Sequence, residues 1–199
     1  MAFKEFKFPD VITTLGLTLT EVNLFPGVPP LEPPADFIAR LRDEVPLAVG
    51  IDTEKARSEY IVAPLLSQLR RLLHGGFGLF SGVEFDVDSE RGLNGYCDFI
   101  LTRSPLLTVL TAPVVAIAEA KNDNTRTGLG QCIAAMVAAR EFNARVSPPI
   151  PTVHGATTTG TAWKFLRLTG SALALDATEY YITEPARILG ILAHILTTS

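Results

Sequence analysis

A short apolar run that ends in two charges constrains the fold of this chain more than any other segment. Residues 114–118 read Val-Val-Ala-Ile-Ala, and Glu119, Ala120 and Lys121 follow directly. An uninterrupted apolar run of this length is typical of a strand buried on both faces of a sheet. We therefore predict a central strand over 114–121 whose charged end opens into a cleft.

We expect an acidic residue from a second strand beside the charged end of this predicted strand. Side chains alternate along a strand, so Glu119 and Lys121 share a face with Val115 and Ile117. Small residues occupy the opposite face, where a helix can pack closely. Asp98 interrupts a second predicted strand, although aspartate is uncommon within strands. We expect Asp98, Glu119 and Lys121 to lie together on one face of the sheet.

These three side chains suit one kind of chemistry. Two carboxylates can hold a divalent cation, and a lysine beside them can orient or deprotonate a water molecule. This is the minimum equipment for metal-assisted hydrolysis of a phosphodiester. Two other interpretations stay open: Glu119 and Lys121 forming an ion pair at a solvated strand end, and Asp98 capping a loop.

The remaining pattern gives an order of elements. Residues 1–35 are expected to be irregular, with a possible short strand over 17–22, and a short helix is predicted over 35–44. A long helix follows over 53–74, with a kink or second start at Pro64. The later elements are strands over 77–87, 96–103 and 114–121, a helix over 127–142, a strand over 151–158, a hairpin over 163–177 and a helix over 184–197.

This order predicts an α/β protein with a mixed sheet and helices on its faces. Short loops let the first three long strands run antiparallel, and the helix that follows makes a crossover to a parallel strand. The length of 199 residues fits a single domain, 1–199. Within it we separate an N-terminal irregular and helical segment, 1–52, a core, 53–160, and a C-terminal hairpin and helix, 161–199.

The core resembles the PD-(D/E)XK nuclease superfamily, which has the restriction-endonuclease-like fold with an αβββαβ core. That family carries an acidic residue on its second core strand, matched by Asp98, and a Glu/Asp-x-Lys on its third, matched by Glu119-Ala120-Lys121. Cys97 stands where many members have proline. The tail from 159 onward looks like that of small cyanobacterial proteins of unassigned function, some of them classed in this superfamily.

The resemblance implies further site residues. Glu59 matches a glutamate that many members carry on the first core helix, and Gln131 matches a glutamine on the helix after the third strand. The implied metal ligands are Asp98, Glu119, Glu59 and the carbonyl of Ala120, with Mg²⁺ or Mn²⁺ as the cofactor. Gln131 would hold Lys121 or the scissile phosphate. Alternatively, Glu59 is an exposed residue paired with Lys55 or Arg57, and Gln131 an ordinary helix residue.

Other polar residues are interpreted as structural. Glu84, Asp86 and Asp88 alternate on one strand and could add metal ligands, but a solvated strand end explains them more simply. The three histidines are far apart in sequence, and Trp163 is expected to pack in the hairpin. Both cysteines lack metal-ligand spacing, so we expect them to be reduced and buried. The histidines and cysteines are His74, His154, His194, Cys97 and Cys132.

Composition limits the partners. The hydrophobic fraction is 47%, and the net charge is −4 from 17 basic and 21 acidic residues. This charge opposes nonspecific nucleic-acid binding by the bare surface. Apolar runs are too short to span a bilayer, and the N-terminus lacks the apolar core of a signal peptide. We therefore expect a cytoplasmic protein with no membrane partner.

Two functions remain. The first is a Mg²⁺-dependent nuclease with nucleic acid as its partner, DNA being favoured and RNA left open. The second is a catalytically silent protein of the same fold that acts through protein contacts or as a homodimer. Exposed leucine and isoleucine side chains over 184–197 would support self-association. A metal-dependent hydrolase acting on another substrate fits the charge but has no positive support.

Overall fold

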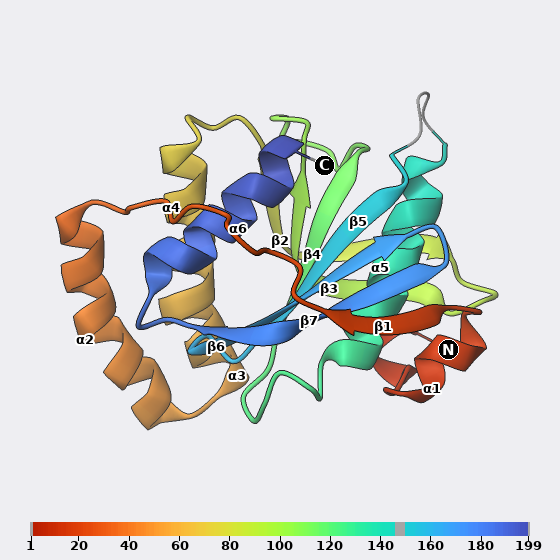
Figure 1. The fold of residues 1–199 in the computed structure, drawn as a ribbon, viewed down its shortest axis with the longest axis horizontal. Coiled ribbons are helices and arrows are strands. Elements are labelled where there is room, and N and C mark those ends of the chain that lie inside the picture. Colours follow the sequence, from red (N-terminus) through yellow and green to blue (C-terminus); the bar gives the residue numbers. More distant parts are fainter. Residues whose placement is uncertain (1, 146–149, 199) are drawn as a thin grey trace.

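One mixed sheet with helices on both faces forms the protein, as the sequence predicted (Figure 1). The structure is a computed structural model that describes residues 2–145 and 150–198. Within them, seven strands are ordered β1-β7-β6-β5-β4-β3-β2. Their bounds are β1 Thr18–Val22, β2 Gly78–Asp88, β3 Leu93–Thr102, β4 Val114–Ala120, β5 Thr152–Thr158, β6 Ala162–Thr169 and β7 Ala172–Tyr181.

The helices divide between the two faces of this sheet. Helices α4 (Ala63–Leu72) and α6 (Pro185–Thr198) pack on one face, with α2 (Ala35–Ile51) outside them. Helix α5 (Leu129–Asn143) covers the other face together with the N-terminal turns η1 (Phe3–Glu5) and α1 (Asp10–Thr14). Each face has its own apolar core, so β4 is buried along its whole length.

The predicted strand pairing is confirmed. Strands β2, β3 and β4 form an antiparallel meander, and α5 crosses over to β5, which lies parallel to β4. The C-terminal hairpin β6–β7 extends the sheet, and β1 adds to its edge as a parallel partner of β7.

The predicted helix over 53–74 is broken into three pieces. Its first piece is α3 (Glu54–Arg57), and the π-helical turn η2 (Ser58–Val62) joins it to α4. Pro64 lies in the first turn of α4, where its missing N–H costs no helical hydrogen bond, so the expected second start is found there. A π-helical turn inserts an extra residue and shifts every later side chain around the helix axis.

Three expectations about local structure were wrong. Helix α2 continues past the predicted end at 44 to Ile51, with Pro46 inside it, and ends where Asp52 takes a left-handed conformation. The N-terminal segment is not wholly irregular, because η1 and α1 form before β1. The alternation along β4 is interrupted by a bulge opposite Leu101–Thr102, which turns Val115 to the α6 side of the sheet, away from Ile117.

Candidate active site

A fork between two neighbouring strands creates the candidate site. The ladder between β3 and β4 ends at the pair Phe99 and Ala118, while β2 stays paired with β3 as far as Leu93. Just beyond the Phe99–Ala118 pair, Asp98 Oδ2 accepts a hydrogen bond of 2.8 Å from the backbone N–H of Ala120. The carboxylate thus replaces the carbonyl that a continued ladder would supply. We call this point the fork.

Glu119 lies at the fork with its side chain fully buried. Its Oε2 accepts a hydrogen bond of 2.7 Å from Gln131 Nε2 on α5. Its Oε1 has no donor among the described residues. The hydroxyl oxygen of Thr157, its register partner on β5, is also buried and without a partner in the described chain. Buried polar atoms are normally satisfied, so these two oxygens indicate a missing polar ligand, a water or an ion.

The pKa of Glu119 lies well above its usual value of 4.5. Burial is the main cause, and the negative charge of Asp98 is the next, while Lys121 acts in the opposite direction. Two carboxyl groups that are close together disfavour the state in which both are ionised. A proton or a cation between the two groups would relieve this repulsion.

Lys121 lies directly after β4, and its backbone N–H continues the ladder with a 2.7 Å hydrogen bond to the Thr158 carbonyl. Its Nζ is 3.7 Å from Glu54 Oε2 at the start of α3. Glu54 is a site residue that the sequence prediction missed. Thr53 caps α3 by accepting a hydrogen bond from the Ala56 N–H, and this cap sets Glu54 in the first turn. Local sequence favours such a cap, but the position of Glu54 beside Lys121 follows only from the fold.

Glu59 lies at the rim of the site. It lines an open hollow of about 300 Å³ together with Asp98 and Ala120, which we call the rim hollow. Its carboxylate forms a 2.9 Å ion pair with Lys55, and both side chains are largely exposed. The structure therefore brings Glu59 near the fork but gives it the surface ion pair that was the alternative interpretation.

The five predicted site residues thus lie around one fork. Gln131 donates its hydrogen bond to Glu119 and not to Lys121, which was one of its two expected partners. Ala120 lines the rim hollow, and its N–H is taken by Asp98. In residues 2–145 and 150–198, no three His, Cys, Asp or Glu side chains converge as a metal cluster. Two carboxylates with a free oxygen nevertheless fit Mg²⁺ or Mn²⁺, because Mg²⁺ keeps several water ligands and needs only one or two carboxylates.

The other polar candidates do not join the carboxyl pair at the fork. Glu84 and Asp86 are exposed, and Asp86 accepts a hydrogen bond of 3.0 Å from Ser89. Trp163 is fully buried, and its ring N–H donates to the Gly160 carbonyl. Cys97 and Cys132 are buried free thiols, and burial raises the pKa of both. These residues have the structural roles that the sequence indicated.

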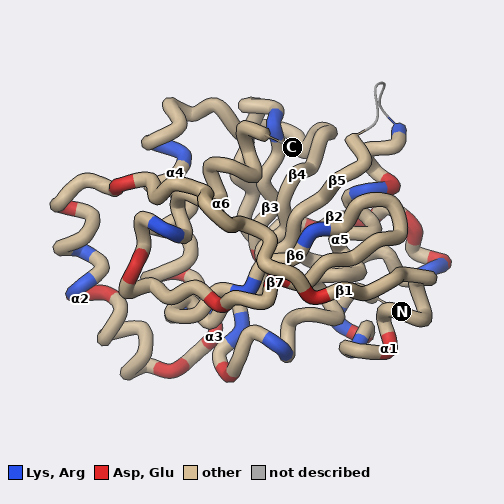
Figure 2. Tube along the Cα trace, viewed as in Figure 1, with Lys and Arg blue, Asp and Glu red and all other residues tan. Residues whose placement is uncertain are grey.

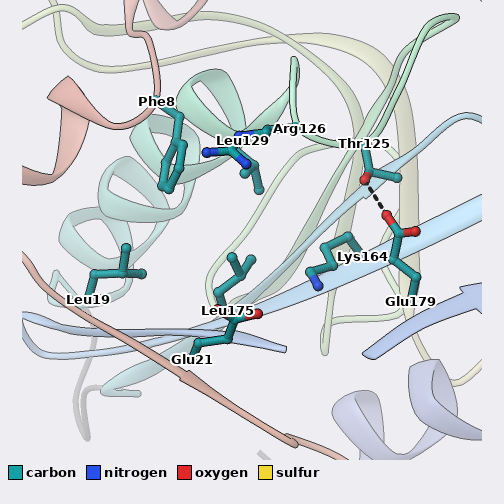
Figure 3. A pocket seen from close by; sticks show the side chains of 9 residues that line it. All are labelled: Phe8, Leu19, Glu21, Thr125, Arg126, Leu129, Lys164, Leu175 and Glu179. Atoms are coloured by element: carbon teal, nitrogen blue, oxygen red, sulfur yellow. Dashed lines mark hydrogen bonds between the residues drawn. The ribbon is translucent and has the colours of Figure 1, made fainter. Parts of the chain in front are cut away.

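A second hollow of about 300 Å³ is lined by the loop that follows β4 and by side chains of β1, β6 and β7 (Figure 3). Arg126 and Lys164 supply positive charge there, and Glu21 and Glu179 supply negative charge. Thr125 closes one end by donating a 2.7 Å hydrogen bond to Glu179. This hollow contains no pair of adjoining buried carboxyl groups, so we place the candidate chemistry at the fork.

Comparison with known proteins gives no family assignment. No protein-family model matches the chain, and a search of curated proteins finds no match. Among the described residues, no helix has the length and apolar character needed to cross a bilayer. The site must therefore be interpreted from its own geometry.

Proposed function

We propose that this protein is a nuclease of the restriction-endonuclease-like type that depends on Mg²⁺ or Mn²⁺. The observation that carries the proposal is Glu119, a fully buried carboxyl group with one oxygen lacking a donor. It lies against Asp98 at the fork of two strands. A buried carboxylate is costly unless it is paired, and a shared cation would meet that need.

Each residue around the fork would have a distinct role. Asp98 and Glu119 would hold the cation, which when bound would lower the pKa of a coordinated water and offset charge on the phosphate. Gln131 would fix the orientation of Glu119 through its 2.7 Å hydrogen bond. Lys121, held by Glu54, would orient the attacking water or stabilise negative charge on the phosphoryl oxygens. Glu59 and the Ala120 carbonyl would complete the ligand set from the rim hollow.

The order of elements supports the same proposal. A helical run, three antiparallel strands, the crossover helix α5 and the parallel strand β5 follow one another in the order that the resemblance implies. The acidic residue stands on the second of these three strands, and the Glu-x-Lys at the end of the third. Fold alone does not imply activity, so the chemistry at the fork carries more of the argument.

The catalytically silent alternative has lost the support it was expected to have. Its sign was a set of exposed leucine and isoleucine side chains over 184–197. Instead, the described leucine and isoleucine residues of α6 are buried against the sheet and α4. The nuclease therefore remains the better proposal.

Cleavage of nucleic acid by three proteins tests it. Wild type, Lys121→Ala and Lys164→Ala would be incubated with single- and double-stranded DNA and RNA in Mg²⁺ and in Mn²⁺. We expect wild type and Lys164→Ala to cleave at similar rates, because Lys164 lies in the second hollow. Loss of a proton-handling group costs about 10²- to 10⁴-fold, so Lys121→Ala should be slower by that factor. EDTA should abolish all cleavage.

Two results would count against the nuclease. One is no cleavage of any substrate in either metal. The other is cleavage that Lys121→Ala and Lys164→Ala retain equally, since the activity would then come from elsewhere or from a contaminant.

A further inference from the structure

A pocket beside the fork has the features of a nucleotide site. It encloses about 360 Å³ between η1, the exposed part of β3 and the start of α5, and we call it the fork pocket. Its polar lining includes Lys4, Tyr96, Asp98, Lys121 and Gln131. Ligand pockets start at about 300 Å³, so this one suits a single small unit and not a broad surface.

Tyr96 is the unusual residue of this pocket. Its side chain is 66% exposed on a strand, whereas Trp163 and Tyr180 are buried. The Tyr96 side chain makes no hydrogen bond or ring contact with any other residue in the described parts of the chain. It stands two residues before Asp98 on β3, which corresponds to about 7 Å along the strand. A bare aromatic face therefore lies next to a proposed metal ligand.

The charged residues that line the pocket indicate which groups of a ligand it can bind. Lys4 is exposed and forms no ion pair with another described residue, and Lys121 is held only by the 3.7 Å contact to Glu54. Glu54 and Asp98 also line the pocket, and the cross-strand neighbour of Tyr96 is Glu84. The two ammonium groups can contact an anion, while the acidic groups lie where a cation would be shared.

One wall of the pocket is held rigidly. Gly95 has a positive φ of 140°, and a Cβ atom there would lie 3.3 Å from the Phe3 ring. Phe3 itself is buried against β3 and α5, so the turn that carries Lys4 is anchored. Tyr96 and Lys4 therefore lie on a preformed surface.

We propose that the fork pocket binds one unpaired nucleotide, with its base against the Tyr96 ring and its phosphate near Lys4 and Lys121. Bases stack on exposed aromatic side chains whatever their identity, but only where the base is not already stacked in a duplex. The inference rests on the proposed nuclease function and deepens it. The substrate of the fork is single-stranded nucleic acid, or an opened end of a duplex.

Binding of short labelled oligonucleotides to metal-free protein tests this inference. Fluorescence anisotropy in EDTA and low salt would compare single-stranded DNA, single-stranded RNA and a closed hairpin duplex, so that no cleavage intervenes. A stacked base contributes about 1–3 kcal/mol, so Tyr96→Ala should weaken single-strand binding by about 5- to 150-fold. Tyr96→Phe should bind within about twofold of wild type, because the ring is retained.

Two controls make the result specific. Tyr181→Ala removes a tyrosine that is 50% exposed on β7 and lies outside the fork pocket, and it should bind like wild type. Lys4→Ala should reduce the salt dependence of single-strand binding by a slope of about 0.7, the value for one phosphate contact. Trp163 fluorescence would confirm that each variant is folded, since this tryptophan is fully buried.

The outcomes separate the two proposals. Single-strand binding that Tyr96→Ala leaves unchanged overturns the nucleotide site, even if the fork cleaves nucleic acid. Equal loss in Tyr96→Ala and Tyr96→Phe also overturns it, because the hydroxyl and not the ring would then matter. Tyr96-dependent binding without cleavage in any metal would support the nucleotide site and reject the nuclease.

Discussion

Glu119 is the residue on which the account depends most. Its carboxyl group is excluded from water, and Gln131 satisfies one oxygen only. Asp98 lies close enough for its negative charge to raise the Glu119 pKa. Without a cation, the raised pKa means that folding favours the protonated form of Glu119, and this links the site to the pH dependence of stability.

We expect metal-free wild type to lose stability as the pH rises. The folded pKa of Glu119 is raised above 4.5, so its stabilising contribution is complete below about pH 4.5 and is lost as the pH passes through the folded pKa. Glu119→Gln should remove this loss and be more stable at neutral pH by about 1–3 kcal/mol, the cost of one buried unsatisfied group. Urea unfolding over a pH series in EDTA measures both.

Glu59→Gln is the matched control for this experiment. Its carboxylate is exposed and paired with Lys55, so it should follow the wild-type pH profile within about 0.5 kcal/mol. If Glu119→Gln also followed the wild-type profile, Glu119 would not hold a proton in the metal-free protein.

Strand periodicity was sufficient to predict that Asp98, Glu119 and Lys121 lie close together, because charged residues at the ends of apolar strands are visible in the sequence. The partner of Lys121 was not predictable in the same way. Glu54 and Glu59 are both in the helical run after Thr53, and the choice between them depends on helix phase. The π-helical turn Ser58–Val62 changes that phase, and no local residue signals it.

At the scale of elements, the N-terminal segment packs closely against two helices at positions where each helix has a glycine. A Cβ atom on Gly130 of α5 would lie 2.3 Å from the Phe6 carbonyl oxygen, and one on Gly190 of α6 would lie 2.2 Å from that of Pro29. Arg187 of α6 donates hydrogen bonds to the carbonyls of Val28 and Phe25. The long N-terminal segment thus runs against both helix layers in direct backbone contact.

Gly190→Ala should therefore destabilise the protein. The added methyl group meets a backbone oxygen and cannot be accommodated by rotating a side chain, so we expect a loss of about 1–3 kcal/mol in the free energy of unfolding. Gly50→Ala in α2 meets nothing within 4 Å and should instead stabilise by about 0.5–1 kcal/mol. Thermal and urea unfolding would measure both, and a neutral Gly190→Ala would show that the contact is loose.

Element boundaries were harder to predict than element order. The helix predicted over 35–44 continues through Pro46, because this proline removes only one hydrogen bond on an exposed face, and Phe37, Leu41 and Ala48 keep α2 packed. The bulge at Val115 could not be predicted, because the residues near it are apolar and an apolar side chain can be buried on either face of the sheet. Packing decided both features, and packing is not readable from local sequence.

At the scale of the whole molecule, the charge distribution limits how nucleic acid can bind. The net charge is −4, and basic and acidic residues are interspersed along the chain (Figure 2). No long-range attraction then brings a phosphate backbone to the protein. The few lysines near the fork, and a cation when one is bound, supply the local attraction, so affinity for nucleic acid should be modest at low salt and rise when metal is added.

The most direct test of the account is Mn²⁺ binding followed by isothermal titration calorimetry. We predict one Mn²⁺ per chain for wild type and for Glu21→Gln in the second hollow, and at least tenfold weaker binding for Asp98→Asn and Glu119→Gln, each of which removes one charged ligand. Glu119→Gln keeps the shape of the side chain, so its loss of binding would not reflect unfolding. Absence of Mn²⁺ binding by wild type, or unchanged binding by Asp98→Asn and Glu119→Gln, would contradict a metal site at the fork.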